Sequence, residues 1–409
     1  MGLTHRRVLV LTQDGPDLRS VLSGVRSLQA AGWTVGIGSR QAGLATRSRS
    51  VRYWHHVPPP SHDLDTFVAA TQAAIRDRGY DLVVGGGDAE VLALAASRAS
   101  LSTWVPYPQI SAAIGVHDKL AVVDDAIAAG LHVPRTQLAE PVALGNVSGP
   151  VLVKSRLHWK PGMSHVPSRQ TTTLVLGREE AERRAAEIRD AGGEPILQEY
   201  LEGQELGFAI VLDRDGRSLA EVQQTSAWTW PPGAGMWSRA ETRAIDPKLA
   251  RQVATFLTRR GWFGLTHLQF IVPPSESPYL IDVNGRFYGS MGLAIRAGAD
   301  LPAIWADALG PSPPVLRAAT KRARAGVRYV CLEYDLQRAW VERRGGLAAD
   351  LVGLAGYQRG AVHSLWSRDD PMPALYSSIL LARRAGGHLV RLDLRRAHGR
   401  QLLRAAFRG

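Results

Sequence analysis

The first 115 residues alternate short apolar runs with amphipathic segments. "RRVLVLT" (6–12) and "YDLVVGGG" (80–87) have the composition of buried strands, whereas "LRSVLSGVRSLQAAG" (18–32) and "DLDTFVAATQAAIRDRG" (63–79) show helical periodicity. Buried strands separated by amphipathic helices are typical of a parallel sheet with helices on both faces. We therefore predict an α/β domain over residues 1–115.

The pattern changes after a predicted linker, "AEPVALGNVSGP" (139–150). The strands predicted beyond residue 115 are "PVLVKS" (150–155), "PILQEYL" (195–201), the hairpin "LGFAIVLDRDGRSLAEVQQ" (206–224), "LTHLQFIV" (265–272) and "YLIDVNG" (279–285), and the helices are "REEAERRAAEIRDAGG" (178–193) and "DPKLARQVATFLTRRG" (246–261). This order predicts an α+β domain on an antiparallel sheet over residues 116–310. We expect a small lobe at 140–200, a large lobe at 201–310, and a mostly helical region over 311–409.

Composition excludes several classes of protein. With 409 residues, 45% hydrophobic and 21% charged, the chain has the composition of a globular protein with two or three domains. No apolar stretch reaches the roughly 18 residues that a membrane helix needs, and the start "MGLTHRRVLVLTQDG" fits a first core strand better than a secretory segment. Cys331 is the only cysteine, which excludes an internal disulfide. We therefore expect a cytoplasmic protein.

Positive charge is concentrated toward the C-terminus. The net charge is +12, and residues 311–409 contribute +11 of it, because they contain 18 Lys and Arg against 7 Asp and Glu. Such a surface attracts anionic lipid, nucleic acid or an acidic partner, but we favour a solvated basic face and do not expect nucleic-acid binding. The segment "RLDLRRAHGRQLLRAAFRG" (391–409) has amphipathic periodicity. We expect it to dock on the protein's own body, with peripheral membrane contact as the alternative.

The stretch "YLIDVNGRFYGS" (279–290) combines a strand pattern with polar side chains. Asp282, Asn284 and Arg286 are two residues apart, so on a strand they point to the same face. Gln269, in the preceding strand, joins them if the two strands are neighbours. Oxygen ligands of this kind suit a hard divalent cation such as Mg²⁺ or Mn²⁺. A polar strand at a sheet edge has the same pattern, so the residue chemistry leaves both interpretations open.

Extended to "YLIDVNGRFYGSMGLAIRAGADLP" (279–302), this stretch resembles the metal-binding signature of the ATP-grasp superfamily. The residues in register with the signature are Asp282, Asn284, Arg286, Gly298, Asp300 and Pro302. Gly285 replaces the usual proline, and Gln269 replaces a carboxylate, as in the carbamoyl phosphate synthetase large-subunit-like branch. The resemblance implies an ATP-grasp fold of carboxylate–amine ligase type, with a pre-ATP-grasp domain at residues 1–115. It also implies Gln269, Asp282 and Asn284 as metal ligands.

Further segments resemble the family in its own order. "HDKLAVVDDAIAAGLHVPRT" (117–136) and "PVLVKS" resemble the segments that carry two phosphate-binding lysines, and "ILQEYLEGQELGFAIV" (196–211) resembles the nucleotide hinge. The resemblance implies ATP as cofactor, with triphosphate contacts from Lys119 and Lys154, adenine contacts from Gln198, Glu199 and Leu201, and ribose contacts from Glu205. Two ammonium groups, a metal ion and an apolar hinge form a coherent site for this nucleotide.

Two segments depart from known motifs. Where many relatives have a Gly-rich lid, "SRLHWKPGMSHVPSRQT" (155–171) has the single glycine Gly162, and Arg156, Lys160 and the backbone near Gly162 are the candidates to replace it. The turn "VVGGGDAE" (83–90) lacks the G-x-G-x-x-G spacing of a dinucleotide site. We interpret it as a structural turn.

The resemblance implies that a substrate carboxylate attacks the γ-phosphate of ATP, giving an acylphosphate that an amine captures, with release of ADP and phosphate. Arg286 is the predicted catalytic residue, because its guanidinium can hold an acylphosphate and a tetrahedral oxyanion. "SAWTWPPGAGMWSRAET" (226–242) contains three tryptophans and Arg239, and forms either a substrate pocket or part of the core. Arg239 and Ser290 are the predicted contacts to small-molecule substrates.

Two other functions remain open. Gln269 keeps a carbamoyl phosphate- or carboxyphosphate-forming enzyme as an alternative. A second alternative is a protein that binds a nucleotide without turnover and has a basic partner-binding surface. The altered lid and the basic C-terminal region keep this alternative open. The sequence identifies neither the carboxylate nor the amine, and it leaves a homodimer open.

Overall fold

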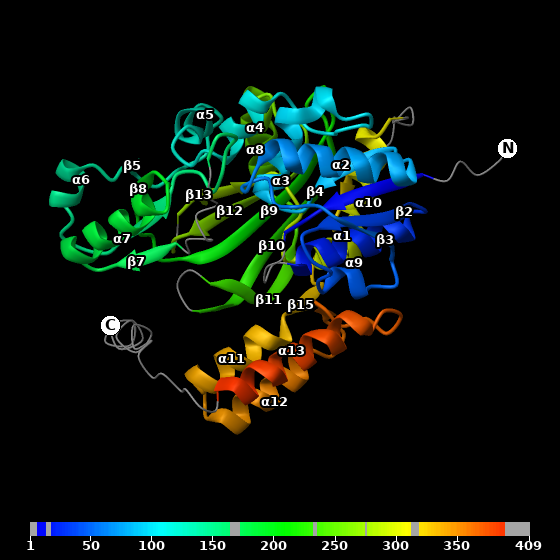
Figure 1. Cartoon of the computed structure of the whole chain (residues 1–409). Helices are drawn as coiled ribbons and strands as arrows, with labels where there is room; N and C mark the ends of the chain where they lie inside the picture. Colours follow the sequence, from blue (N-terminus) through cyan, green and yellow to red (C-terminus); the bar gives the residue numbers. More distant parts are fainter. Residues whose placement is uncertain are drawn as a thin grey trace.

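The computed structural model describes residues 6–13, 18–163, 172–231, 235–274, 276–311 and 319–388, and the strands of these ranges form three sheets (Figure 1). The first sheet is parallel, in the order β3-β2-β1-β4. Its strands are β1 (Arg7–Leu11), β2 (Thr34–Ser39), β3 (Val51–His56) and β4 (Leu82–Gly85). The helical elements beside it are α1 (Leu18–Ala30), η1 (Ala45–Arg47), α2 (Leu64–Arg78), α3 (Asp88–Ser97), η2 (Arg98–Ser100) and α4 (Ile110–His117). The predicted parallel sheet is therefore confirmed.

The second sheet is antiparallel and small, in the order β5-β8-β6-β7. Its strands are β5 (Thr136–Leu138), β6 (Val151–Ser155), β7 (Thr173–Val175) and β8 (Pro195–Glu199), and α5 (Val122–Ala128), α6 (Pro141–Gly145) and α7 (Arg178–Asp190) belong to the same stretch of chain. Residues 139–150, predicted as a linker, contain α6. A short helix forms there because Pro141 fits a first helical turn and Leu144 is buried with the apolar face of α7.

The third sheet is the largest, in the order β13-β12-β9-β10-β11-β15-β16, with β14 beside β10. Its strands are β9 (Gln204–Leu212), β10 (Ser218–Trp230), β11 (Met236–Arg243), β12 (Gly264–Val272), β13 (Tyr279–Asn284), β14 (Lys321–Arg322), β15 (Arg328–Val330) and β16 (Val362–His363), and its helices are α8 (Pro247–Arg259), α9 (Met291–Arg296) and α10 (Leu301–Leu309). The predicted hairpin is the antiparallel pair β9–β10. Its turn places Gly216 at φ +79°, a conformation that favours glycine.

One apolar core joins the first and third sheets. It contains strand residues from both sheets, such as Leu9 and Phe208, together with Trp305 of α10. Phe287, just after β13, is buried against α1, where a side chain at Gly24 would lie 2.7 Å from its ring. This packing brings the carboxyl end of β4 close to the end of β13, and so sets the geometry of the site described below.

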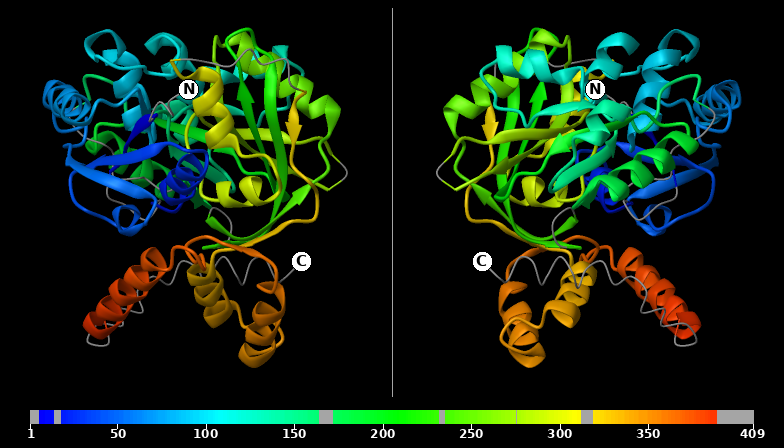
Figure 2. Two further views of the ribbon diagram at one scale, coloured as in Figure 1. Left: turned by 90° about the vertical axis from the view of Figure 1, so that its right-hand side faces the viewer. Right: turned by 90° about the vertical axis from the view of Figure 1, so that its left-hand side faces the viewer.

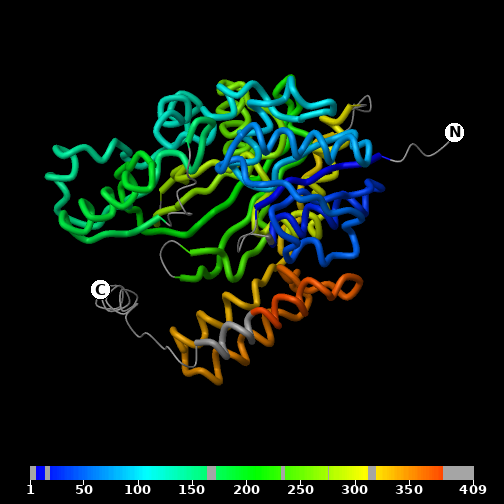
Figure 3. The backbone as a smooth tube through the Cα atoms, viewed as in Figure 1, coloured from blue at the N-terminus to red at the C-terminus, as the bar shows by residue number. Residues whose placement is uncertain are grey.

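The chain leaves the third sheet through β15 and continues into α11 (Leu332–Glu342), α12 (Leu347–Tyr357) and α13 (Met372–His388) (Figure 3). These helices extend away from the sheets, and α11 packs on β10 and β11 (Figures 1 and 2). The amphipathic segment 391–409 lies outside the described residues. Across the described ranges, no helix combines the length and the apolar character that a membrane span requires.

Candidate functional site

The β12–β13 pair brings the three predicted metal-binding residues together. Gln269 and Asp282 lie opposite each other in the antiparallel register. Nδ2 of Asn284 donates to Oε1 of Gln269 at 3.4 Å and to Oδ2 of Asp282 at 3.3 Å. The alternation of side chains along a strand explains why Asp282 and Asn284 share this face.

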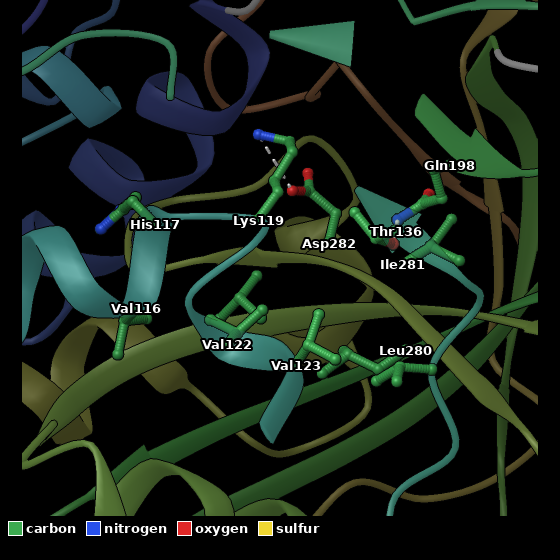
Figure 4. Close-up of a pocket in the computed structure, with 12 residues that line it drawn as sticks. Val116, His117, Lys119, Val122, Val123, Thr136, Gln198, Leu280, Ile281 and Asp282 are labelled. Atoms are coloured by element: carbon green, nitrogen blue, oxygen red, sulfur yellow. Dashed lines mark hydrogen bonds and ion pairs between the residues drawn. The ribbon is translucent and has the colours of Figure 1, made fainter. Parts of the chain in front are cut away.

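Lys119 and Lys154 approach the same carboxylate from two other elements. Nζ of Lys119 lies 3.5 Å from Oδ1 of Asp282 (Figure 4). The turn that carries Lys119 is held by Asp118, whose side chain accepts from two backbone N–H groups of the turn and pairs with Arg156. Burial lowers the pKa of Lys154 on β6 to about 8, although Asp282 opposes this shift. Burial alone would raise the pKa of Asp282, but the two lysines lower it below its usual value.

The predicted adenine and ribose contacts lie on β8 and β9. Gln198 accepts from Nζ of Lys154 at 2.6 Å and donates to Oγ1 of Thr136 at 3.1 Å. The backbone N–H of Glu199 donates to the carbonyl of Arg135 at 2.9 Å. Leu201 follows the end of β8 and is half-buried. These hydrogen bonds engage the polar groups of Gln198 and Glu199 that the resemblance assigns to adenine. The nucleotide contacts of Gln198, Glu199 and Leu201 therefore stay predictions.

Glu205 is nearly enclosed on β9. Its carboxylate accepts from the indole N–H of Trp237 on β11. Burial raises the pKa of Glu205 to about 7. The carboxyl group therefore changes its charge near neutral pH.

A pocket with one apolar side and one polar side lies between these elements (Figure 4). Its apolar side includes Val122, Val133 and Leu280, and its polar side includes Lys119, Gln198 and Asp282. A second pocket adjoins it, because His117, Lys119, Asp282 and Val283 line both. The second pocket also includes Asp88, His158 and Asn284.

Arg286 makes an ion pair that the sequence did not suggest. Its Nε donates to Oδ1 of Asp88 at 2.5 Å, and a second nitrogen donates to Oδ1 of Asn284 at 2.9 Å. His158 contacts the other oxygen of Asp88 at 2.8 Å, and Nε2 of His117 lies 3.7 Å from the first. Burial alone would raise the pKa of Asp88, but Arg286 and the hydrogen bond with His158 hold it well below its usual range.

Asp88 belongs to the turn at residues 83–90, which we interpret as structural from the sequence alone. The turn is tight, because a side chain at Gly85 would lie 2.7 Å from the backbone nitrogen of Val91. A signal for its role was nevertheless present in the sequence. A carboxylate directly after a Gly-rich strand end lies at the carboxyl edge of a parallel sheet, where ligands bind in open α/β folds.

Ser290 lies in a buried polar cluster next to Arg286. Its hydroxyl accepts from Nε2 of Gln224 at 2.8 Å, and the same nitrogen lies 3.3 Å from Nε2 of His267. The ring of His267 stacks on Tyr288 at 4.2 Å. Burial, together with the charge of Arg286, lowers the pKa of His267 to about 3, so this imidazole is neutral. The cluster is buried, and the predicted contact of Ser290 with a substrate stays a prediction.

Arg239 is not brought together with the other predicted site residues. Its Nε donates to Asp335 of α11 at 2.9 Å, and its guanidinium lies 3.7 Å from the ring centre of Trp228. Trp230 donates to Gln337 of α11 at 2.7 Å. Arg239 and two of the three tryptophans therefore attach the C-terminal helices to β10 and β11. Among the described residues, no hydrogen bond or ion pair links Arg239 to a residue that lines the pockets. Its predicted role in substrate binding stays untested.

The candidate lid is described only in part, because residues 164–171 lie outside the described ranges. Arg156 pairs with Asp118 and, at 3.0 Å, with Glu194. Lys160 is exposed. Gly162 has φ +91° and an open space beside its Cα. Arg156 is therefore already engaged in holding the turn of Lys119.

The parallel sheet, the small antiparallel sheet and the large sheet surround a polar site, and comparison with known proteins relates this arrangement to ATP-grasp folds. Residues 193–331 match the family model described as "ATP-grasp in the biosynthetic pathway with Ter operon". The resemblance to the ATP-grasp superfamily expected from the sequence is thereby confirmed. No curated protein matches the chain in sequence.

Solved structures agree with this fold. The biotin carboxylase domain of Hydrogenobacter thermophilus 2-oxoglutarate carboxylase is 14% identical, with a TM-score of 0.59, over 78% of this chain and 73% of that chain. The L-amino acid ligase of Bacillus licheniformis is 14% identical, with a TM-score of 0.57, over 75% of each chain. N5-carboxyaminoimidazole synthetase of Staphylococcus aureus, complexed with ADP, is 13% identical, with a TM-score of 0.57, over 78% of this chain and 80% of that chain. At these identities the likeness establishes the fold alone.

Proposed function

We propose that the chain is an ATP-dependent, ADP-forming ligase that joins a small-molecule carboxylate to an amine, with an amino acid or a peptide-like molecule as substrate. The observation that carries the proposal is the grouping of two ammonium groups, a carboxylate, an amide and a guanidinium in and directly behind the walls of two adjoining pockets. Lys119, Asp282 and Asn284 line the pockets. Lys154 donates to the lining residue Gln198, and Arg286 donates to Asn284. The structural neighbours support the proposal, since they include an amino acid ligase and a carboxylase crystallised with MgADP and bicarbonate.

The pocket lined by Val122, Val133 and Leu280 suits a nucleotide base, because an aromatic base gains from apolar contacts on its faces. Lys119 lines its polar side, and Lys154 donates to Gln198 of the same side, so both charges are placed to offset those of a triphosphate. With a pKa of about 8, Lys154 is mostly protonated at neutral pH. A bound polyanion favours the protonated form further.

The donor set fits a hard divalent cation under two conditions. Among the described residues, no group of three or more His, Cys, Asp and Glu side chains can hold a metal ion, so any site here depends on amide oxygens. Asp282, Gln269 and Asn284 offer one carboxylate and two amides, and phosphate oxygens must supply the remaining charge. Asn284 presents its NH₂ group to Gln269 and Asp282, and its Oδ1 to Arg286, so the amide must also turn before its oxygen can join these two residues at a cation. Bound there, Mg²⁺ would neutralise phosphate charge.

The residues of the chain then have distinct tasks in the reaction. A substrate carboxylate oxygen forms a bond to the γ-phosphorus of ATP as the bond to ADP breaks, and the amine nitrogen next forms a bond to the acyl carbon as phosphate leaves. Lys119 and Lys154 bind the phosphates, and Arg286 holds the oxygens on which negative charge develops. Asp88 keeps the guanidinium of Arg286 oriented through a fixed ion pair.

The test is a phosphate-release screen with Mg-ATP over pairs of amino acids and small carboxylic acids. Phosphate release that requires both partners of one pair supports ligation. Release with bicarbonate and no amino acid supports a carboxyphosphate-forming enzyme instead, the alternative that Gln269 keeps open. If calorimetry with pure protein detects no magnesium-dependent binding of ATP, the proposal is wrong.

A further inference from the structure

The second pocket contains a carboxylate and an imidazole that are joined by a hydrogen bond. Nδ1 of His158 lies 2.8 Å from Oδ2 of Asp88, and both residues line this pocket. Burial alone would raise the pKa of Asp88, but Arg286 and His158 hold it well below its usual range, so its carboxylate is ionised and can only accept. Nδ1 of His158 therefore carries the proton of the hydrogen bond. In the neutral ring the lone pair lies on Nε2, which can take up a proton.

His158 is the member of the pair that a bound molecule can reach. Its side chain is 34% exposed, whereas that of Asp88 is 12% exposed. His117 also lines the pocket, but its side chain is 5% exposed. Nδ1 of His117 donates to the carbonyl of Ala113 at 2.8 Å, and its Nε2 faces Asp88. Of the two histidines that line this pocket, His158 is therefore the one whose ring is open to a substrate.

The segment that carries His158 does not depend on this hydrogen bond for its position. On one side, the hydroxyl of Ser155 at the end of β6 donates to the carbonyl of Leu157 at 2.6 Å. On the other side, Trp159 is fully buried in the main core. The hydrogen bond with Asp88 therefore orients the ring rather than holding the chain, as the partner of a catalytic histidine does.

Amine capture requires a proton acceptor. The amino group of an amino acid is mostly an ammonium ion at neutral pH, and its nitrogen cannot attack until a proton has left. The guanidinium of Arg286 has no acceptor lone pair. Asp88 and Asp282 are weak bases, because despite their burial the cations beside them lower their pKa values. Imidazole is the side chain that most often performs general acid–base catalysis.

We propose that His158 is the general base of the amine-capture step and that Asp88 orients it. The assignment rests on the ligase reaction proposed above. Nε2 takes one proton from the incoming ammonium, the freed lone pair forms the bond to the acyl carbon, and the bond from this carbon to the phosphate oxygen breaks. A second proton of the nitrogen leaves with the phosphate, and His158 returns its proton to water. Arg286 donates to the other oxygen of Asp88, so the proton acceptor and the group proposed to hold the acyl oxygens are neighbours.

The test compares two nucleophiles, with the standard amino acids as probes and Mg-ATP. Hydroxylamine is uncharged at neutral pH and captures acylphosphates without a base, so hydroxamate reports the activation step alone. His158→Gln should lower dipeptide formation, measured by mass spectrometry, by at least about 10²-fold. Hydroxamate formation and the Kd for ATP should stay within about threefold of the unchanged chain. Glutamine can still donate to Asp88, so this substitution removes the base and keeps the hydrogen bond.

A second variant separates a base from a structural role. His158→Ala leaves space beside Asp88 for free imidazole, and added imidazole should restore dipeptide formation by at least about tenfold. His62→Ala, at an exposed position before α2, is the matched control. It should form dipeptide at the rate of the unchanged chain and should not respond to imidazole.

Several results would overturn the proposal. His158→Gln could form dipeptide within about threefold of the unchanged chain, or imidazole could fail to restore His158→Ala. Losses of hydroxamate formation or ATP affinity as large as the loss of dipeptide would assign His158 to the phosphates instead. If the unchanged chain forms neither hydroxamate nor dipeptide, the proposed ligase itself is wrong, and the assignment of His158 falls with it.

Discussion

The carboxylate of Asp88 accepts a 2.5 Å hydrogen bond from the guanidinium of Arg286, which lies 198 residues later in the chain. Asp88 follows a strand of the parallel sheet, and Arg286 follows the last long strand of the large sheet. Both side chains are largely buried. The ion pair therefore links the N-terminal sheet directly to the predicted catalytic residue, and a change at either end should be felt at the other.

Asp88→Asn should lower the rate of phosphate release by at least about tenfold, because an amide orients a guanidinium less firmly than a carboxylate does. The affinity for ATP should change little, since Asp88 contacts neither of the two lysines. Kinetics of phosphate release and calorimetry with ATP measure the two effects separately. Asp65→Asn, at an exposed position of α2, is the control. Equal losses of rate and ATP affinity would contradict a positioning role.

Arg286→Ala should reduce turnover by about 10²- to 10³-fold, the usual effect of removing one donor to a developing oxyanion. Binding of ATP should weaken by less than about threefold, because this role is confined to the transition state. The comparison of kcat with the Kd for ATP tests it. Arg296→Ala, at an exposed position of α9, should behave as the unchanged chain does. A loss of ATP affinity as large as the loss of turnover would argue against the catalytic assignment.

The affinity for ATP should fall as the pH rises through about 8, where Lys154 loses its proton. The charged ammonium binds phosphate, so above this pKa the Kd should rise by up to about tenfold per pH unit. The same shift affects stability. The pKa of Lys154 is lower in the folded chain, so the unfolded chain binds more protons between pH 8 and the ordinary lysine pKa, and this residue's contribution to stability increases with pH there.

Calorimetry with ATP from about pH 6.5 to 9.5 measures how the Kd changes as Lys154 loses its proton. Lys154→Gln should bind ATP weakly and show little change across this range. Lys248→Gln, at an exposed position of α8, should show the same pH dependence of the Kd for ATP as the unchanged chain. A Kd that is constant across the range in the unchanged chain would show that Lys154 does not hold the nucleotide.

Local patterns of the sequence predicted the elements that build the site. The β-alternation of Asp282 and Asn284 and the position of Gln269 on the preceding strand were sufficient to place these three side chains together, because strand geometry is local and the two strands pair directly. The turn signal at Gly216 likewise correctly predicted the β9–β10 hairpin. The parallel sheet followed from the order of apolar runs and amphipathic segments.

Contacts between distant segments were not predictable in the same way. The role of Asp88 depends on how α1 and Phe287 pack the first sheet against the third, and nothing within its own turn encodes this packing. The Trp-rich segment around Arg239 predicts either a substrate contact or core packing, and the structure does not test the substrate contact. In the fold the nearest acid to Arg239 is Asp335, which reaches it only when α11 docks on β11. A single sequence gives the residue types of two such partners, but it does not give the distance between their side chains in the fold.

The C-terminal helices depend on one buried cation. Arg338 is fully buried, and its guanidinium donates to Asp335 at 2.9 Å and to Asp350 at 2.7 Å while lying 3.8 Å from the ring centre of Trp228. Arg338→Met should therefore destabilise the C-terminal helices by about 3–5 kcal/mol, because it leaves the buried carboxylate of Asp350 without a cation and leaves Asp335 with Arg239 alone. The burial of charge makes this loss much larger than that of an exposed ion pair.

Urea unfolding followed by tryptophan fluorescence measures this change, since Trp228 lies in the affected cluster. Arg359→Met, at an exposed position next to α12, is the matched control and should stay within about 0.5 kcal/mol of the unchanged chain. The double change of Arg338 to Met and Asp350 to Leu should recover much of the lost stability, because it removes the carboxylate left without a cation and keeps the pair of Arg239 with Asp335. If Arg338→Met alone is as stable as the Arg359→Met control, the buried cation does not hold the helices.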